Sequence, residues 1–356
     1  MIKKKKKKSE IPKRITYQVI NAFVDDTNTD YILRGNPAAV VIVHDKAETK
    51  ILLGDDRLKQ KIAFEIGLSE TAFVFKLEDE KEGEKYLIEW FSPTTKVGLC
   101  GHASLASAYS IFEMLNKEKT KQQQHLIFTY GHGAGKNELF LERDQETKKI
   151  TMQFPSLPPV RVDDMNESKR ILDLVREAFD DCDTDRSEYM SAFKNSIGDT
   201  FIYIDREKSR LNSSVDGVYF NNTKNSNEAI DYDKLAKIGG RGVVITSLAP
   251  TSNAMCDFQS RFFAPSIGIL EDPVTGSAHC GLAPFYKSLL SSSSRKGVGE
   301  VLFLRGMQLS ERGGLVECRE IQNSLKNGSM AVELRGYCAF DKTDSVEIGI
   351  DINTEN

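Results

Sequence analysis

The stretch Glu271-Asp272-Pro273-Val274-Thr275-Gly276-Ser277-Ala278-His279 decides the fold of this chain. Pro273 disfavours a helical conformation at the residue before it, which predicts an extended Asp272. Apolar residues then recur with helical spacing, so we expect a helix to begin near Gly276. The first N–H groups of a helix lack partners within it and carry the positive end of its dipole. The stretch therefore predicts a carboxylate beside an anion-binding helix end.

An earlier part of the chain repeats this pattern weakly. Phe91-Ser92-Pro93 precedes Leu99-Cys100-Gly101-His102-Ala103, much as Phe263-Ala264-Pro265 precedes Thr275-Gly276-Ser277-Ala278. In this alignment Gly101 corresponds to Gly276 and His102 to Ser277. Chance similarity is the alternative explanation. A true repeat predicts two similar domains whose glycine-led helices direct their N-termini into one cleft.

Composition indicates a packed globular protein. The 356 residues are 40% hydrophobic and 28% charged, and the net charge of −4 does not indicate nucleic-acid binding. No apolar run reaches the roughly 18 residues of a membrane span, and the N-terminus has no signal-peptide pattern. Six scattered cysteines then favour thiols in a reducing, cytoplasmic compartment. The absence of CxxC and HxxxH spacing predicts no metal site.

The expected organisation is a tail followed by two domains. The lysine run 3–8 predicts a disordered tail over residues 1–14. Pro155, Pro158 and Pro159 mark the boundary between a domain at 15–150 and a second at 151–350, with the C-terminal strand free to return to the first. The patterns predict an α+β fold, with mostly antiparallel strands and two apolar central helices.

Five motifs in order resemble the PhzF-like family, named for an isomerase of phenazine biosynthesis. They are Gly35-Asn36-Pro37-Ala38-Ala39-Val40, Ser69-Glu70-Thr71-Ala72-Phe73, Leu99-Cys100-Gly101-His102-Ala103, Arg261-Phe262-Phe263-Ala264-Pro265 and Glu271-Asp272-Pro273-Val274-Thr275-Gly276-Ser277-Ala278-His279. The resemblance implies a diaminopimelate-epimerase-like fold, in which each of two similar domains wraps a curved, barrel-like sheet around a central helix. It also implies a homodimeric isomerase that uses neither cofactor nor metal.

The resemblance assigns six site residues. The catalytic acid of the family falls on Glu70, its histidine on His102 and its aspartate on Asp272. Its substrate-binding serine falls on Ser277, and the glycines that present backbone amides fall on Gly101 and Gly276.

Each assigned side chain also has a structural interpretation. Glu70 suits proton transfer if burial raises its pKa from about 4.3, but a strand-start glutamate is also compatible with exposure. His102 and Ser277 are each compatible with plain helix capping, and Asp272 with an acid favoured by the helix dipole. Outside the six, we expect His279 to be structural.

The predicted function is cofactor-independent isomerisation of a small, carboxylate-bearing metabolite, by proton transfer through Glu70 in the cleft between the domains. One alternative is a catalytically idle scaffold that binds a protein partner. Another is a racemase or epimerase that uses Cys100, although the second repeat has Val274 or Thr275 where such an enzyme needs a second thiol.

Two departures from the family leave a different substrate or reduced activity open. Gly98 stands where an acidic residue is common, and Glu89-Trp90 where a basic residue is common.

Overall fold

The computed structural model describes residues 10–25, 34–44, 46–77, 84–117, 124–131, 137–181, 188–206, 208, 216–220, 230–250, 253, 255–292, 303–322 and 328–351. The lysine run 3–8 lies outside these residues. The chain divides into two compact units: a first of residues 1–21, 37–138 and 339–356, and a second of 22–36 and 139–338. The domain limits expected from the sequence stay a prediction.

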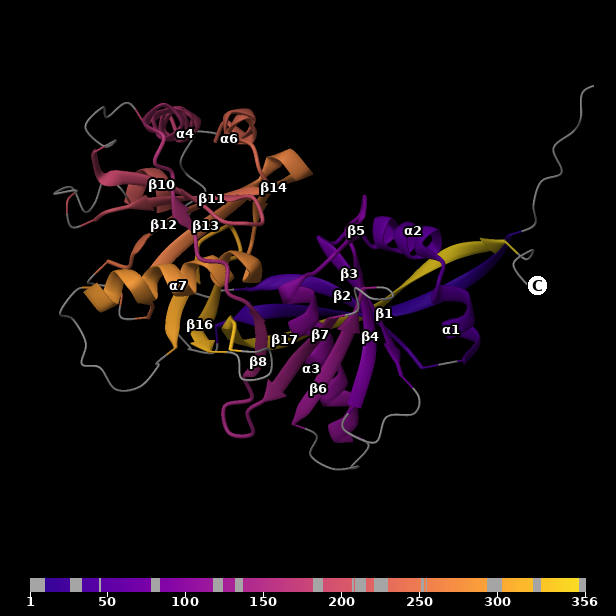
Figure 1. Ribbon diagram of the computed structural model, residues 1–356. Helices are drawn as coiled ribbons and strands as arrows, with labels where there is room; N and C mark the ends of the chain where they lie inside the picture. The colour runs from indigo at the N-terminus through magenta and orange to yellow at the C-terminus, as the bar shows by residue number, and fades with distance from the viewer. Residues whose placement is uncertain are drawn as a thin grey trace, which may run out of the picture. The chain divides into compact units, whose positions relative to one another are not determined.

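In the first unit the helices α2 and α3 both pack on the strand β3 (Figure 1). Its elements are β2 (Asn36–Val43), α1 (Lys46–Leu52), α2 (Asp56–Ile66), β3 (Glu70–Lys76), β4 (Glu84–Phe91), β5 (Lys96–Val97), α3 (Gly101–Lys117) and β6 (His125–Tyr130). The strands β1 (Glu10–Val24), β7 (Asn137–Arg143) and β17 (Met330–Asp351) contribute residues to both units, as does β2, whose first residue, Asn36, belongs to the second.

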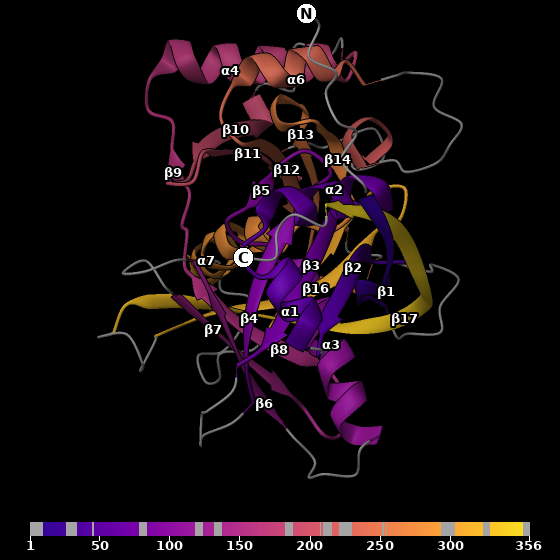
Figure 2. The ribbon, with the colours of Figure 1, turned by 90° about the vertical axis from the view of Figure 1, so that its right-hand side faces the viewer.

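In the second unit, α4 and α6 lie side by side on one side of strands β10 to β13, and α7 lies on the other (Figures 1 and 2). Its elements are β8 (Ile150–Pro155), β9 (Val160–Arg161), α4 (Met165–Ala178), β10 (Met190–Lys194), β11 (Asp199–Ile204), the π-helix η3 (Asp216–Phe220), α6 (Tyr232–Ile238), β12 (Gly242–Leu248), β13 (Phe258–Ala264), the 3-10 helix η4 (Pro265–Ile267), β14 (Ile269–Asp272), α7 (Gly276–Ser292), β15 (Leu304–Gln308) and β16 (Gly314–Gln322).

The repeat suspected from sequence is present in the strand pairing. In the first unit β2 pairs parallel with β3, β3 antiparallel with β4, and β4 antiparallel with β5 but parallel with β6. In the second unit β11, β12, β13, β14 and β15 pair in the same order with the same directions. The helices α3 and α7 occupy equivalent places and begin at Gly101 and Gly276, as predicted. The fold is therefore α+β, with two similar domains, each a curved, mostly antiparallel, barrel-like sheet around a central helix.

The central helices are buried on nearly all sides in their first three turns, as expected for helices that are apolar all round. The polar residues of α3 are compatible with this burial because they bond within the helix. The hydroxyls of Ser104, Ser107 and Ser110 each donate to the carbonyl four residues earlier, at 2.6, 2.7 and 3.1 Å. No buried hydroxyl of these three serines is left without an acceptor.

Helix α7 accommodates a proline in its interior. Pro284 has no N–H, so the carbonyl of Cys280 loses its usual helical donor. The backbone N–H of Leu157 donates to that carbonyl at 3.0 Å. This approach requires Gly281, since a Cβ there would lie 2.6 Å from the Phe201 ring and 3.1 Å from the Leu157 carbonyl oxygen. The segment after β8 is thereby fastened to the middle of α7.

Each unit has its own hydrophobic core. The core of the first unit gathers around Phe73, Phe75 and Phe91, and that of the second around Ile202, Ile245 and Phe263.

In the described part of the chain, no helix has the length and apolar character needed to cross a membrane.

Candidate functional site

Glu70 is the first residue of β3, where the parallel strand β2 places Ala38 opposite it. Its carboxyl is buried, with 8% of the residue exposed, so the exposed alternative is wrong. Burial raises the pKa of the Glu70 carboxyl above its usual value, and a hydrogen bond from Ser69 opposes part of this rise. A carboxyl with a raised pKa accepts and returns a proton more readily near neutral pH.

His102, the second residue of α3, lies between two other reactive groups. Its Nε2 is 3.3 Å from Glu70 Oε2, and its Nδ1 is 3.5 Å from Cys100 Sγ. The Ser69 hydroxyl lies 3.5 Å from the same Nε2. We call Glu70, His102 and Cys100 the three-donor cluster, because each side chain offers one atom that can donate electrons to a metal ion. The structure thus brings together two of the predicted catalytic residues and the thiol considered for a racemase.

The three-donor cluster is also the group in the described residues that could hold a metal ion. Each residue offers one ligand atom, and these atoms lie within 4.8 Å of one another. A carboxylate oxygen, an imidazole nitrogen and a thiolate suit a borderline-soft ion such as Zn²⁺. In this structure the imidazole contacts its two partners through different nitrogens, with Nδ1 facing the thiol and Nε2 facing the carboxyl.

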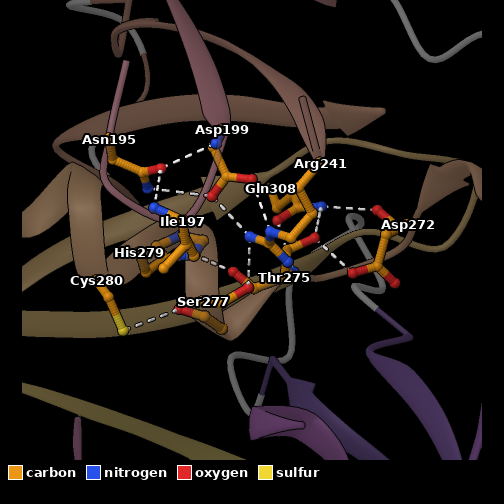
Figure 3. Close-up of polar contacts among 11 residues, drawn as sticks. Asn195, Ile197, Asp199, Arg241, Asp272, Thr275, Ser277, His279, Cys280 and Gln308 are labelled. Atoms are coloured by element: carbon orange, nitrogen blue, oxygen red, sulfur yellow. Dashed lines mark hydrogen bonds and ion pairs between the residues drawn. The ribbon is translucent and has the colours of Figure 1, made fainter. Parts of the chain in front are cut away.

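In the second unit, Asp272 ends β14 in the predicted extended conformation. Its carboxylate is buried, and both oxygens accept hydrogen bonds: Oδ1 from the Asn36 amide at 2.7 Å and Oδ2 from the Thr275 hydroxyl. The amide of Gln308 donates to the Asp272 carbonyl at 2.7 Å and its oxygen accepts from the Thr275 N–H at 2.8 Å (Figure 3). These bonds hold the chain that leads into α7.

Ser277 lies in the first turn of α7 and accepts a hydrogen bond from Arg241 Nη2 at 3.0 Å. Arg241 also makes a two-point ion pair with the fully buried Asp199, at 2.8 and 2.6 Å (Figure 3). The Arg241 guanidinium lies over the Phe262 ring. Because the Ser277 oxygen already accepts from a guanidinium, its own proton is available for an acceptor such as a carboxylate.

Sequence reasoning missed Arg241, Asp199, Asn36, Gln308 and Thr275. A weak signal existed in Gly239-Gly240, which precedes Arg241. Gly240 has φ +83°, and a Cβ there would lie 2.2 Å from the Gly198 carbonyl oxygen, so only glycine fits. The two turns can then approach closely enough for Arg241 to reach Asp199.

The expected structural character of His279 fits its surroundings. Its ring is fully buried, Nδ1 lies 2.9 Å from the Thr275 carbonyl oxygen, and the ring packs near Phe258. Burial lowers the pKa of His279 to about 4, with that hydrogen bond opposing the fall. The side chain is therefore neutral at neutral pH.

Glu89, which stands where a basic residue is common in the family, has its negative charge balanced by two lysines. In the first unit Glu89 Oε1 accepts from Lys96 at 2.6 Å, and its other oxygen pairs with the fully buried Lys59. Burial opposes ionisation of Glu89, but the hydrogen bonds and charges of both lysines outweigh it and lower its pKa. In the second unit, Arg261 occupies the place of Glu89 and pairs with Glu271 at 2.7 and 2.9 Å. Both units therefore have an ion pair at this place, with the acidic and basic residues exchanged.

The comparisons with known proteins agree with this architecture. A family model described as phenazine biosynthesis-like protein matches residues 24–342. The chain belongs to the phenazine biosynthesis-like family. One relative, from Mus musculus, is named phenazine biosynthesis-like domain-containing protein 2. It is 31% identical over 296 residues, which are 82% of this chain and 88% of the relative. An uncharacterized isomerase of Pseudomonas aeruginosa is 33% identical over 269 residues, 74% of this chain and 79% of that protein.

Solved structures support the same assignment to the phenazine biosynthesis-like family. A PhzF family protein from Enterococcus faecalis superposes with a TM-score of 0.63 at 25% identity, covering 94% of this chain and 100% of that chain. A putative PhzC/PhzF protein from Clostridium difficile gives a TM-score of 0.62 at 25% identity with the same coverage. The fold expected from the sequence motifs is confirmed.

Proposed function

We propose that this phenazine biosynthesis-like protein is an isomerase of a small, carboxylate-bearing metabolite, and that Glu70 transfers the proton. The observation that carries the proposal is the buried Glu70 carboxyl beside His102 at the first turn of a glycine-led helix. The relative from Pseudomonas aeruginosa that is named an isomerase supports the reaction class.

The chemistry needs a group that removes a proton from one carbon and returns it to another. In the proposal, the Glu70 carboxylate takes the proton and the developing negative charge lies near the N-terminus of α3. His102 and the backbone N–H of Gly101 donate hydrogen bonds to that charge. Burial shields Glu70 from water and raises its pKa toward neutrality, which favours proton transfer in both directions.

The second unit supplies the proposed binding groups. Ser277 offers its hydroxyl proton, and Gly276 opens the helix whose N–H groups favour an anion. Asp272 is held by Asn36 and Thr275 and would orient the substrate or a water molecule. That both half-sites serve one cleft stays a prediction.

The proposed reaction requires neither cofactor nor metal, because the carbon acid can be activated by the hydrogen-bond donors alone. We also propose a cytoplasmic homodimer with no nucleic-acid or membrane partner. The two-thiol racemase alternative is disfavoured. Thr275 stands where Cys100 stands in the first unit, and Cys280 is buried inside α7 with a pKa raised by burial to about 12.

Deuterium incorporation tests the proposal even while the substrate is unidentified. The protein is incubated with a metabolite extract in D₂O, and carboxylates that gain deuterium are detected by mass spectrometry. Glu70→Gln should abolish the gain, whereas Glu65→Gln, at an exposed position of α2, should leave it intact. Equal incorporation by Glu70→Gln would contradict the proposal. No incorporation by any variant, together with a tightly bound partner in pull-downs, would support the idle scaffold.

A further inference from the structure

Cys100 differs in its surroundings from the other described cysteines. All five described cysteines are thiols. Burial raises the pKa of Cys256 and of Cys280 to about 12, and it also raises the pKa of Cys318 and of Cys338. A thiol with a raised pKa is seldom ionised and reacts slowly with electrophiles.

The position of Cys100 favours a thiolate. Cys100 directly precedes α3, and its carbonyl accepts the Ser104 N–H at 3.1 Å, so its side chain lies at the positive end of the helix dipole. His102 Nδ1 lies 3.5 Å from the sulfur, within the range for a hydrogen bond to sulfur. An adjacent imidazole and a helix N-terminus are both surroundings that activate cysteine thiols in proteins.

We propose that Cys100 is a nucleophilic thiol, activated through His102 and Glu70, at which small soft electrophiles modify this protein. The three-donor cluster forms a chain in which each side chain contacts the next: Sγ with Nδ1 at 3.5 Å, and Nε2 with Oε2 at 3.3 Å. Nothing in the isomerase chemistry requires this thiol, so the proposal adds a separate reactivity to the site.

The proton and charge balance of the step can be written for iodoacetamide. The sulfur forms a bond to the methylene carbon, and the carbon–iodine bond breaks as iodide leaves with the bonding electrons. The thiol proton passes to His102 Nδ1, while the proton on Nε2 passes to the Glu70 carboxylate. The imidazole begins and ends neutral, and the negative charge moves from Glu70 to iodide. Because burial raises the pKa of Glu70, its carboxylate is a better final acceptor than an exposed glutamate.

Cys256 is a matched control within the same chain. The two residues are exposed to nearly the same extent, 7% for Cys100 and 8% for Cys256, so access alone does not separate them. The difference lies in charge, since the largest electrostatic contribution beside Cys256 is Asp257, which opposes thiolate formation. Any preference for Cys100 therefore reports its activation.

The experiment is brief native-state labelling with iodoacetamide near neutral pH, followed by peptide mass spectrometry. A full-length Cys182→Ser chain is used, so that only the five described cysteines compete. We expect Cys100 to react at least about tenfold faster than Cys256, as is typical of an activated thiol. His102→Asn should remove most of that advantage, and Glu70→Gln a part of it. Labelling in guanidinium, where all five thiols should react alike, corrects for detection.

Equal native labelling of Cys100 and Cys256 would overturn the proposal, as would a rate at Cys100 that His102→Asn leaves unchanged. If His102→Asn does not fold, the comparison of the two thiols in the native chain decides by itself. The readout is alkylation and needs no turnover. A reactive Cys100 in a protein whose deuterium exchange does not depend on Glu70 would contradict the proposed function alone.

Discussion

Replacing Arg241 with methionine should destabilise the second unit by about 3 kcal/mol, because it leaves a buried carboxylate without its cation. Asp199 is fully buried and accepts two hydrogen bonds from Arg241, at 2.8 and 2.6 Å. After the replacement, the Asn195 amide at 3.2 Å remains as a side-chain donor. Breaking a buried ion pair at one partner costs about 3–5 kcal/mol. Arg241 itself is 30% exposed, so water can partly replace it, which favours the lower end.

Two control variants separate the free energy lost with the ion pair from the free energy lost with the packing of the Arg241 side chain. The double variant Asp199→Asn with Arg241→Met removes both charges and should recover at least half of the lost stability, since a neutral amide costs less to bury. Lys194→Met removes the cation of an exposed pair, in which Lys194 and Glu167 are 42% and 40% exposed. That change should cost less than about 1 kcal/mol.

Urea unfolding followed by circular dichroism measures the free energy, and hydrogen exchange of β11, β12 and α7 peptides locates the loss. Exchange should accelerate there more than in the first unit. A cost for Arg241→Met no larger than that for Lys194→Met would refute the reasoning, as would a double variant less stable than the single one. In either case the Asp199–Arg241 pair would not contribute the stability that its geometry indicates.

Three further outcomes follow from the geometry. Because the folded pKa of Glu70 lies above its ordinary value of 4.5, the contribution of Glu70 to stability is lost as pH rises from that value through the raised pKa. The free energy of unfolding of Glu70→Gln, relative to that of the native protein, should therefore rise over the same pH range in urea unfolding. A relative free energy that stays constant or falls over that range would contradict this expectation. Chelators should leave deuterium exchange unchanged, whereas added Zn²⁺ should inhibit it by occupying the three-donor cluster; inhibition by chelators alone would reverse the metal-free assignment. Gly242→Ala should lower the free energy of unfolding in urea by about 1–3 kcal/mol, since the new Cβ would lie 2.4 Å from the Phe262 ring. Gly98→Ala is the control and should cost far less, since no atom lies within 4 Å of its new Cβ.

The local pattern determined the elements that carry the site. Pro273 predicted an extended Asp272, and glycine-led apolar runs predicted helices that begin at Gly101 and Gly276. These features depend on backbone preferences and on hydrophobic periodicity over a few residues, which the sequence contains directly. The duplication was also visible, because the two Phe-x-Pro segments precede equivalent helices.

Only the tertiary structure decided which side chains meet. Lys59, Glu89 and Lys96 come together from α2, β4 and β5, and Arg241 reaches Asp199 because Gly198 and Gly240 allow two turns to approach. The contacts of Lys59 with Glu89 and of Arg241 with Asp199 join residues that are 30 and 42 positions apart in sequence. Their formation depends on the packing of elements that are distant in sequence, which helix and strand propensities do not specify. The burial that raises the pKa of Glu70 is likewise a property of the assembled unit, since it depends on side chains from other elements.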